Sequence, residues 1–252
     1  AGMEAARVAA LRGHDVTLYE KSDKLGGELL LGAKTPLLYD WDHLAKYYVA
    51  QMAKTGVKVE LGKEATAAII KKEAPDALIV ATGAKPAESK IPGCDRANVT
   101  NVFDVLNGKV TMGDKVVVIG GSEIAVQTAE WIAEQGKEVT ILEKNKFVGY
   151  DVNIFNTLSH RRTLAALKVK TLVNVNVEAI TDEGVEISTL GGKEATIEAD
   201  TIVNAEGMAA DNALLNGLKA SAATEIYAVG DCAGIRKLYE SIHDGYKVGV
   251  KV

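Results

Sequence analysis

Apolar positions along the chain change repeatedly between helical and strand-like spacing. In the first third the spacing predicts a helix over 2–13 that stops at Gly13, followed by a strand over 15–20. A second helix is predicted over 40–54, and the apolar run 76–81 predicts a strand that is buried on both faces. Two shorter elements complete this part, a strand over 57–61 and a helix over 64–73. The order is that of an α/β protein.

The second half repeats this order. A strand over 115–119, a helix over 123–136 and a strand over 139–143 are predicted, and a helix near 153–166 comes next. The stretch 169–203 has the pattern of antiparallel strands around a Gly191-Gly192 hairpin turn. The chain ends with a strand over 225–229, the turn Gly230-Asp231 and a helix over 238–251. The polar stretch 84–112, between the two halves, is interpreted as a linker.

Each half contains the same chemical pattern. Gly2 opens a helix and Glu20 ends the following strand, 18 positions later; Ala125 lies in the loop-and-helix run 120–125, and Glu143 follows it by the same 18 positions. A glycine loop, a helix and an acidic strand end are typical of a dinucleotide-binding unit. Two such units suggest a protein that passes a hydride between two dinucleotides. The first unit lacks its leading strand and glycines, so the chain looks like part of something longer.

The second loop has the residues that dinucleotide binding needs. Gly120 permits a tight turn from strand to helix, and Gly121 with Ser122 lets a pyrophosphate approach the helix N-terminus. Glu143 can accept hydrogen bonds from a ribose diol and would repel a 2′-phosphate, which favours NADH over NADPH. The adjacent Lys144 keeps NADPH as the less favoured alternative.

Further candidates lie at turns and at the carboxyl ends of strands, where open α/β sheets bind ligands. Gly26-Gly27 allows close approach of the backbone to a cofactor, Thr82-Gly83 follows a buried strand, and Asp231 can hydrogen-bond a sugar-like hydroxyl. The candidate cofactor-binding residues are Gly2, Glu20, Lys21, Gly26, Gly27, Ala81, Thr82, Gly83, Gly120, Gly121, Ser122, Glu143, Gly207, Gly230 and Asp231. No residue is predicted to be a catalytic acid or base, and no metal ligands are predicted.

Composition narrows the class of protein. A net charge of −5 gives no reason to expect nucleic acid or an anionic membrane as partner. Cys94 and Cys232 are the chain's two cysteines, too few for a four-thiolate iron–sulfur cluster and without the spacing of a redox pair. The segment after Gly27 has no cysteine to receive electrons, which argues against a disulfide reductase. A reducing, cytoplasmic compartment is expected.

Several runs together carry a family resemblance: Tyr19-Glu20-Lys21 with Lys24-Leu25-Gly26-Gly27, Val80-Ala81-Thr82-Gly83-Ala84, Ile91-Pro92-Gly93, Ile226-Tyr227-Ala228-Val229-Gly230-Asp231-Cys232 and Ser241-Ile242-His243-Asp244-Gly245-Tyr246. The chain resembles the C-terminal module of the NADH:flavin oxidoreductase / 2,4-dienoyl-CoA reductase family, which includes 2-enoate reductases and trimethylamine dehydrogenase. The resemblance implies an α/β fold with two Rossmann-like domains of the glutathione-reductase type, the second inserted in the first. FAD would be bound by residues 1–108 and 206–252, and NAD(H) by the inserted residues 109–205.

Two functions remain open. The first is an electron-input module that passes a hydride from NADH to FAD. The resemblance implies that the electrons then reach an FMN-binding barrel with a 4Fe-4S cluster, both outside this chain, for reduction of an activated C=C bond. The second is a catalytically silent domain that binds ADP or another nucleotide, as in trimethylamine dehydrogenase-like members; Ser122, the acidic Glu123 and the incomplete first loop favour it. The expected partners are nicotinamide and flavin nucleotides and the barrel domain of the parent enzyme.

Overall fold

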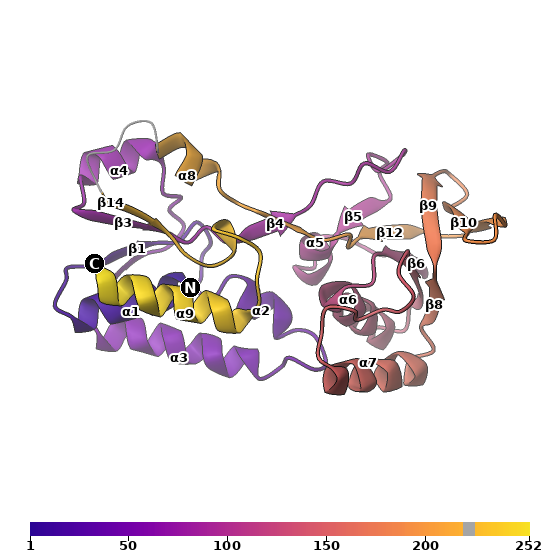
Figure 1. Ribbon diagram of the computed structural model, residues 1–252, viewed down its shortest axis with the longest axis horizontal. Coiled ribbons are helices and arrows are strands. Elements are labelled where there is room, and N and C mark those ends of the chain that lie inside the picture. The colour runs from indigo at the N-terminus through magenta and orange to yellow at the C-terminus, as the bar shows by residue number, and fades with distance from the viewer. Residues whose placement is uncertain (219–224) are drawn as a thin grey trace. The chain divides into compact units, whose positions relative to one another are not determined.

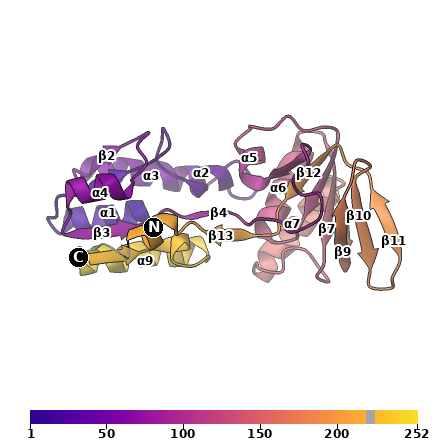
Figure 2. The ribbon, with the colours of Figure 1, turned by 90° about the horizontal axis from the view of Figure 1, so that it is seen from above.

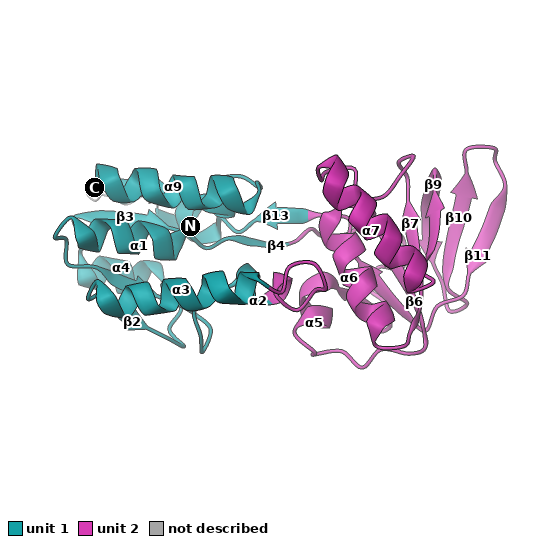
Figure 3. Cartoon of the chain, turned by 90° about the horizontal axis from the view of Figure 1, so that it is seen from below, with its two compact units in different colours: residues 1–30, 40–85, 208–252 teal, residues 31–39, 86–207 magenta. Residues whose placement is uncertain are grey.

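The computed structural model describes residues 1–218 and 225–252, which divide into two compact units (Figure 1 and Figure 3). The first unit comprises residues 1–30, 40–85 and 208–252, and the second comprises 31–39 and 86–207. Each unit contains both helices and parallel strands, so the predicted α/β class is confirmed. Residues 86–108 lie in the second unit, whereas the predicted domain boundary followed residue 108.

The first unit is a set of helices packed with two pairs of parallel strands, β1 with β2 and β3 with β14. No strand in the described part of the chain joins one pair to the other. Its elements are α1 (Gly2–Leu11), β1 (Thr17–Tyr19), α3 (Trp41–Lys54), β2 (Lys58–Glu60), α4 (Ala67–Glu73), β3 (Ala77–Val80), β13 (Met208–Ala210), α8 (Ala213–Leu218), β14 (Glu225–Ala228), the 3-10 turn η1 (Gly230–Cys232) and α9 (Leu238–Lys251). Two further elements, α2 (Glu28–Gly32) and β4 (Ala84–Pro86), span the boundary between the units.

Helix α1 lies between α9 and α3 in the first unit (Figure 3). Glycines allow the close approach of α9: a Cβ atom at Gly245 would lie 2.3 Å from the carbonyl oxygen of Ala1, and one at Gly249 would lie 2.8 Å from that of Ala5. The sequence therefore sets this helix pair through its small residues as well as through its apolar ones.

The second unit is built on a five-stranded parallel sheet in the order β5-β12-β6-β7-β8. A three-stranded antiparallel sheet β11-β10-β9 lies beside it (Figure 2). Its elements are β5 (Val99–Asn101), α5 (Val102–Leu106), β6 (Lys115–Ile119), α6 (Glu123–Glu134), β7 (Glu138–Glu143), α7 (Ile154–Ala166), β8 (Lys170–Val173), β9 (Val175–Ile180), β10 (Val185–Thr189), β11 (Glu194–Ile197) and β12 (Thr201–Asn204).

The parallel sheet is buried on both faces. One apolar cluster joins Val116 and Ile141 to α6 residues such as Ile132, and a second joins Val117 and Leu142 to the antiparallel sheet. This is why the central strands have continuous apolar runs instead of alternation.

Two predictions about connecting segments were wrong. The stretch 84–112 is not a linker, because it contains β4, β5 and α5, and β5 extends the parallel sheet beside β12. The stretch 169–203 is antiparallel only over β9, β10 and β11; β8 and β12, at its two ends, pair with parallel neighbours. The predicted turn at Gly191-Gly192 is confirmed, since it joins β10 to β11.

Among the residues that the structure describes, none of the helices combines the length and the apolar character that crossing a bilayer requires.

Candidate nucleotide-binding sites

The glycine loop of the second unit connects β6 to α6. Gly120 has a φ of +115°, and a Cβ atom there would lie 2.4 Å from the carbonyl oxygen of Ala205, after the neighbouring strand β12. Only glycine satisfies both the backbone conformation and the close approach. The tight strand-to-helix turn predicted at this position is therefore present.

Glu143, at the end of β7, lies beside this loop. Its Oε1 accepts hydrogen bonds from the backbone N–H and the side-chain Nδ2 of Asn145, each at 2.7 Å, and the residue is 3% exposed. A Cβ atom at Gly121 would lie 2.6 Å from Oε2 of Glu143. The fold thus brings together the loop and the acid that the sequence singled out, with one carboxylate oxygen facing the loop.

Ser122 and Asp151 each have a polar group at the start of α6. Ser122 is the N-cap residue, and its hydroxyl oxygen is buried without a hydrogen-bond partner among the described residues. The backbone N–H of Glu123, the first helical residue, donates to Oδ1 of Asp151 at 2.7 Å. The sequence analysis missed Asp151.

A signal for Asp151 does exist in the sequence. The spacing that relates Glu20 to Glu143 also relates Glu28 to Asp151, so an acid follows the strand-end glutamate by the same eight positions in both units. Between them, Leu25 and Val148 occupy equivalent positions and both are buried. The duplication therefore extends past the strand and through the turn.

The first unit holds its acid in the same way. Oε1 of Glu20 accepts hydrogen bonds from the backbone N–H of Ser22 at 2.8 Å and from its hydroxyl at 2.9 Å. Both glutamates are thus anchored by a donor two residues later in the chain. Glu20 is partly exposed, and the adjacent Lys21 is exposed.

The parallel pair β3–β14 places two candidate segments side by side at its carboxyl end. Ala81, Thr82 and Gly83 follow β3, and Gly230 with Asp231 follows β14 in η1. The start of α1 is close by, because a Cβ atom at Gly2 would lie 3.0 Å from that of Ala81. The hydroxyl of Thr82 donates to the carbonyl oxygen of Asp211.

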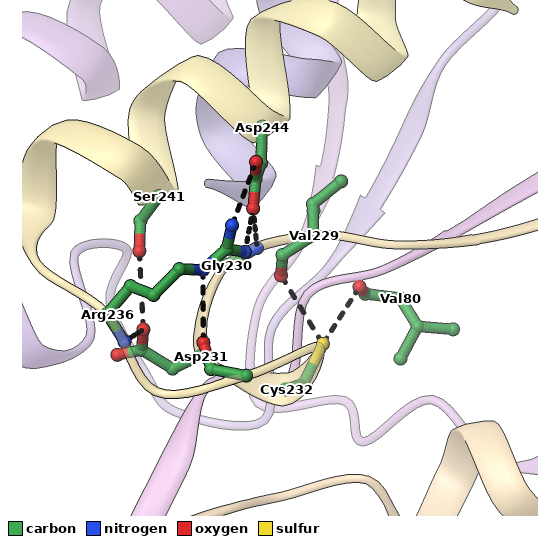
Figure 4. A network of polar contacts seen from close by, with 9 residues as sticks. Val80, Val229, Gly230, Asp231, Cys232, Arg236, Ser241 and Asp244 are labelled. Atoms are coloured by element: carbon green, nitrogen blue, oxygen red, sulfur yellow. Dashed lines mark hydrogen bonds and ion pairs between the residues drawn. The ribbon is translucent and has the colours of Figure 1, made fainter.

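Asp231 is held by donors from the loop and helix that follow it (Figure 4). Its Oδ1 accepts from the backbone N–H of Arg236 at 3.1 Å and from the hydroxyl of Ser241 at 3.3 Å. Arg236 also forms an ion pair with Asp244, whose Oδ2 accepts from the N–H of Gly230 at 3.4 Å. This network fixes the turn that the sequence associated with a cofactor hydroxyl.

Glu28 lies in the same part of the first unit and was not predicted. Gly26 and Gly27 lead into α2, where Glu28 is the first residue, and a Cβ atom at Gly83 would lie 3.6 Å from its Oε1. Burial raises the pKa of Glu28 to about 7, and the neighbouring carboxylate of Asp231 adds to the rise. A carboxyl group that titrates near neutral pH therefore lies among the candidate residues of this unit.

The candidate residues fall into two sets, one in each unit. Gly120, Gly121, Ser122, Glu143 and Gly207 belong to the second unit, and the other candidates belong to the first. Gly207 has a φ of +147°, and its carbonyl oxygen accepts from the N–H of Ala87 at 3.0 Å. It lies at the point where the chain leaves the second unit.

A buried polar pair in the second unit was also missed. Nδ1 of His160 on α7 lies 3.0 and 3.1 Å from the two carboxylate oxygens of Glu130 on α6, and these residues are 2% and 0% exposed. Burial raises the pKa of Glu130, although the hydrogen bond to His160 opposes the rise. The pair connects two helices of the unit.

The two cysteines lie in different units. Sγ of Cys232 is buried and lies 3.1 Å from the carbonyl oxygen of Val80 and 3.3 Å from that of Val229 (Figure 4). Cys94, in the second unit, lies 3.4 Å from the carbonyl oxygen of Ser89. In the described residues no group of three or more His, Cys, Asp or Glu side chains could hold a metal ion.

Comparison with known proteins gives a match over nearly the whole chain. The sequence model of the family described as "Pyridine nucleotide-disulphide oxidoreductase" matches residues 1–249. A cinnamate reductase of Clostridium sporogenes is 33% identical over 258 residues, which is 100% of this chain and 38% of the relative. An NADH oxidase of Thermoanaerobacter brockii is 31% identical, again over 100% of this chain and 39% of the relative.

A solved structure supports the same comparison. That of a 2-naphthoyl-CoA reductase in complex with 2-naphthoyl-CoA superimposes with a TM-score of 0.97 at 62% identity, covering 99% of this chain and 38% of that protein. The chain therefore spans about two fifths of the length of these relatives.

Proposed function

Since the chain belongs to the pyridine nucleotide-disulphide oxidoreductase family, which implies binding of FAD and NAD(P)H, we propose that it is the electron-input module of a flavin-dependent oxidoreductase. In this function a hydride passes from NADH to FAD, and the flavin takes up one proton from solvent. One observation carries the proposal: two glutamates, each at a strand end after a glycine-helix segment, are anchored by the same backbone contact.

The residues of the second unit fit NADH. The carboxylate of Glu143 has one oxygen held by Asn145 and the other facing Gly121, so it can accept hydrogen bonds from a ribose diol. The hydroxyl oxygen of Ser122, at the start of α6, is buried without a hydrogen-bond partner among the described residues, and the hydroxyl can donate to a phosphate. The negative charge of Glu143 would repel the 2′-phosphate of NADPH, so NADH is the proposed donor.

The residues of the first unit fit FAD. Glu20 has the anchored geometry expected of a ribose ligand, and the carboxyl ends of β3 and β14 bring Thr82, Gly83 and Asp231 to one edge. Gly2 and Gly26 lie close to the side chains of Ala81 and Leu30, whereas the space beside Gly27 is open to a cofactor. When bound, the flavin supplies the two-electron chemistry, and the chain supplies binding and orientation.

The onward acceptor is proposed to lie in a part of the parent enzyme that this chain does not include. The relatives are named for reduction of cinnamate and of 2-naphthoyl-CoA, and most of their length lies outside the match. We assign to that remainder the FMN-binding barrel, the 4Fe-4S cluster and the reduction of an activated C=C bond.

A second candidate function is a nucleotide-binding domain without redox activity. It is favoured by the contact of Asp151 with the Glu123 amide, because a carboxylate already holds one of the donors that a pyrophosphate would use. In that case ADP or no nucleotide would occupy the sites, and the chain would serve to pack against the rest of its enzyme.

Absorption spectroscopy of the purified chain tests the first proposal against the second. Flavin bands near about 370 and 450 nm, and release of FAD on denaturation, are expected. Anaerobic addition of NADH should then bleach the longer-wavelength band, and NADPH should bleach it more slowly. A colourless protein that releases ADP or no nucleotide, and that NADH does not reduce when FAD is supplied, would contradict the first function and favour the second.

A further inference from the structure

The segment after β7 folds back over the glycine loop of the second unit. The N–H of Gly149 donates to the carbonyl oxygen of Gly121 at 2.6 Å, and Oδ1 of Asp151 accepts from the N–H of Glu123 at 2.7 Å. Val148 is buried and lies against the loop, since a Cβ atom at Gly121 would be 2.9 Å from its Cγ1. The segment is thus bound to the loop at Gly149 and at Asp151, and it brings a carboxylate to the start of α6.

This carboxylate uses a donor that nucleotide binding needs. Glu123 is the first residue of the 12-residue helix α6, and its N–H is one of the groups at a helix start that have no partner within the helix. Such groups bind phosphate in dinucleotide sites, and the helix dipole favours any anion placed there. Asp151 and a pyrophosphate would therefore compete for the same amide.

The neighbouring hydroxyl provides a contrast. The oxygen of Ser122 is buried and has no partner within the described residues, although it lies one residue before the amide that Asp151 holds. At the start of the helix the amide of Glu123 therefore already donates to a carboxylate of the protein, whereas the hydroxyl of Ser122 can bind a ligand. A phosphate that approaches Ser122 approaches the charge of Asp151 as well.

We infer that Asp151 sets the affinity of the second site for phosphate-bearing nucleotides, by holding the Glu123 amide until the phosphates of NAD(H) displace it. The inference rests on the proposed function, because it takes the loop to be the NADH site. Asp151 acts on the phosphates and not on the adenosine, which is bound through Glu143. Its effect is therefore confined to ligands that carry phosphate.

The duplication supports this assignment. Glu28 occupies the equivalent position in the first unit, eight residues after Glu20 as Asp151 is after Glu143. There the acid lies beside Gly83, at the carboxyl end of β3. An acid at this position is thus a repeated feature of the turn that follows each ribose-binding glutamate.

The test compares Asp151→Asn with Glu183→Gln, in the exposed turn between β9 and β10, which changes the net charge equally. Isothermal titration of the whole chain with NADH, ADP and adenosine is the measurement. Asp151→Asn should bind NADH and ADP about tenfold more tightly than Glu183→Gln, with the gain shrinking as salt screens the charge. The affinity for adenosine should be the same in both variants.

Asp151→Ser provides a second variant, because serine keeps a capping oxygen without the charge. It should show the same gain for NADH and ADP. The role of Asp151 would be overturned if Asp151→Asn, Asp151→Ser and Glu183→Gln bound NADH with equal affinity. It would also be overturned if the affinity for adenosine rose as much as the affinity for NADH. Either result leaves the proposed function in place. A wild-type chain and variants that all fail to bind NADH and adenosine would overturn the proposed function and this inference together.

Discussion

Each unit anchors a glutamate at the end of a strand, but the surroundings of the two glutamates differ. Glu20 and Glu143 are each anchored by the N–H of the residue two positions later, but Glu143 is 3% exposed whereas Glu20 is partly exposed. Five parallel strands of the second unit form one sheet, whereas the described strands of the first unit form separate pairs. The turn after the strand is therefore sufficient to anchor the acid, and the acid is buried in the unit whose parallel strands form one sheet.

The hydrophobic cores also differ in burial, and the second unit again has the more buried one. Two buried clusters cover both faces of the sheet in the second unit, while the cluster around Met52 in the first unit contains few fully buried residues. Because buried apolar area is the main stabilising contribution, we expect the second unit to resist unfolding more strongly. The chain's two tryptophans, Trp41 on α3 and Trp131 on α6, allow each unit to be followed separately.

The largest effect is expected at the buried pair of the second unit. His160→Ala removes the imidazole that contacts both carboxylate oxygens of Glu130, and a buried acid without its partner costs about 3–5 kcal/mol. Urea denaturation followed by circular dichroism is the measurement. Arg161→Ala, on the exposed face of the same helix, is the control and should change little. Equal stability of the two variants would contradict the structural role of the pair.

A matched pair of core substitutions compares the two sheets directly. Ile141 in β7 is 0% exposed, and Leu18 occupies the equivalent position in β1 but is only partly buried. Ile141→Ala should cost about 2–5 kcal/mol, and Leu18→Ala about 1–2 kcal/mol, because less contact is lost. In a Trp41→Phe background the fluorescence of Trp131 reports Ile141→Ala, and in a Trp131→Phe background Trp41 reports Leu18→Ala. A larger loss of stability from Leu18→Ala than from Ile141→Ala would contradict this expectation.

The two glutamates should differ as ligands. Glu143→Gln removes a charged acceptor from a buried position, so the affinity for NADH should fall about tenfold or more and the preference over NADPH should narrow. Glu20→Gln should weaken FAD binding by a smaller factor, because solvent already competes for this carboxylate. Titration of each variant with both nucleotides is the measurement. Each substitution serves as the control for the other, and loss of both ligands in one variant would indicate unfolding instead.

The last effect depends on pH and is confined to the range in which Glu28 titrates. Burial and Asp231 raise the pKa of Glu28 from 4.5 to about 7, so the folded chain binds this proton more tightly than the unfolded chain does. Stability is then greatest below about pH 4.5, falls as pH rises toward about 7, and is constant above it as far as Glu28 is concerned.

Glu28→Gln should remove this fall, raising the melting temperature by about 7 °C or more at pH 8 relative to the wild type, with no gain at pH 4.5. Differential scanning fluorimetry across this range is the measurement, and Glu183→Gln is the control for net charge. An identical gain at both pH values would show that the titration of Glu28 is not the cause.

Much of the architecture follows from local patterns. The helices of α1, α6 and α9 and the strands β3, β6 and β7 were predicted to within two residues at each end, because their apolar spacing and glycine stops are local features. The resemblance to the C-terminal module of the 2,4-dienoyl-CoA reductase family is confirmed by the family match and by the relatives. The polar stretch 84–112 was misread, since short strands such as β5 have little pattern of their own and form by pairing with β12.

The sequence by itself determined the glycine turn at Gly120 and the acidic strand ends, because each depends on residues that are near one another along the chain. It also determined the duplication, because the same local pattern occurs twice. The tertiary structure decided what surrounds them. It placed Asp151 on the amide of Glu123, 28 positions away, and His160 on Glu130, 30 positions away. It also decided the raised pKa of Glu28, because burial beside Asp231 comes from elements at opposite ends of the chain. The sequence specifies which groups are present and how far apart they lie along the chain, and only packing decides which of them are buried and contact one another.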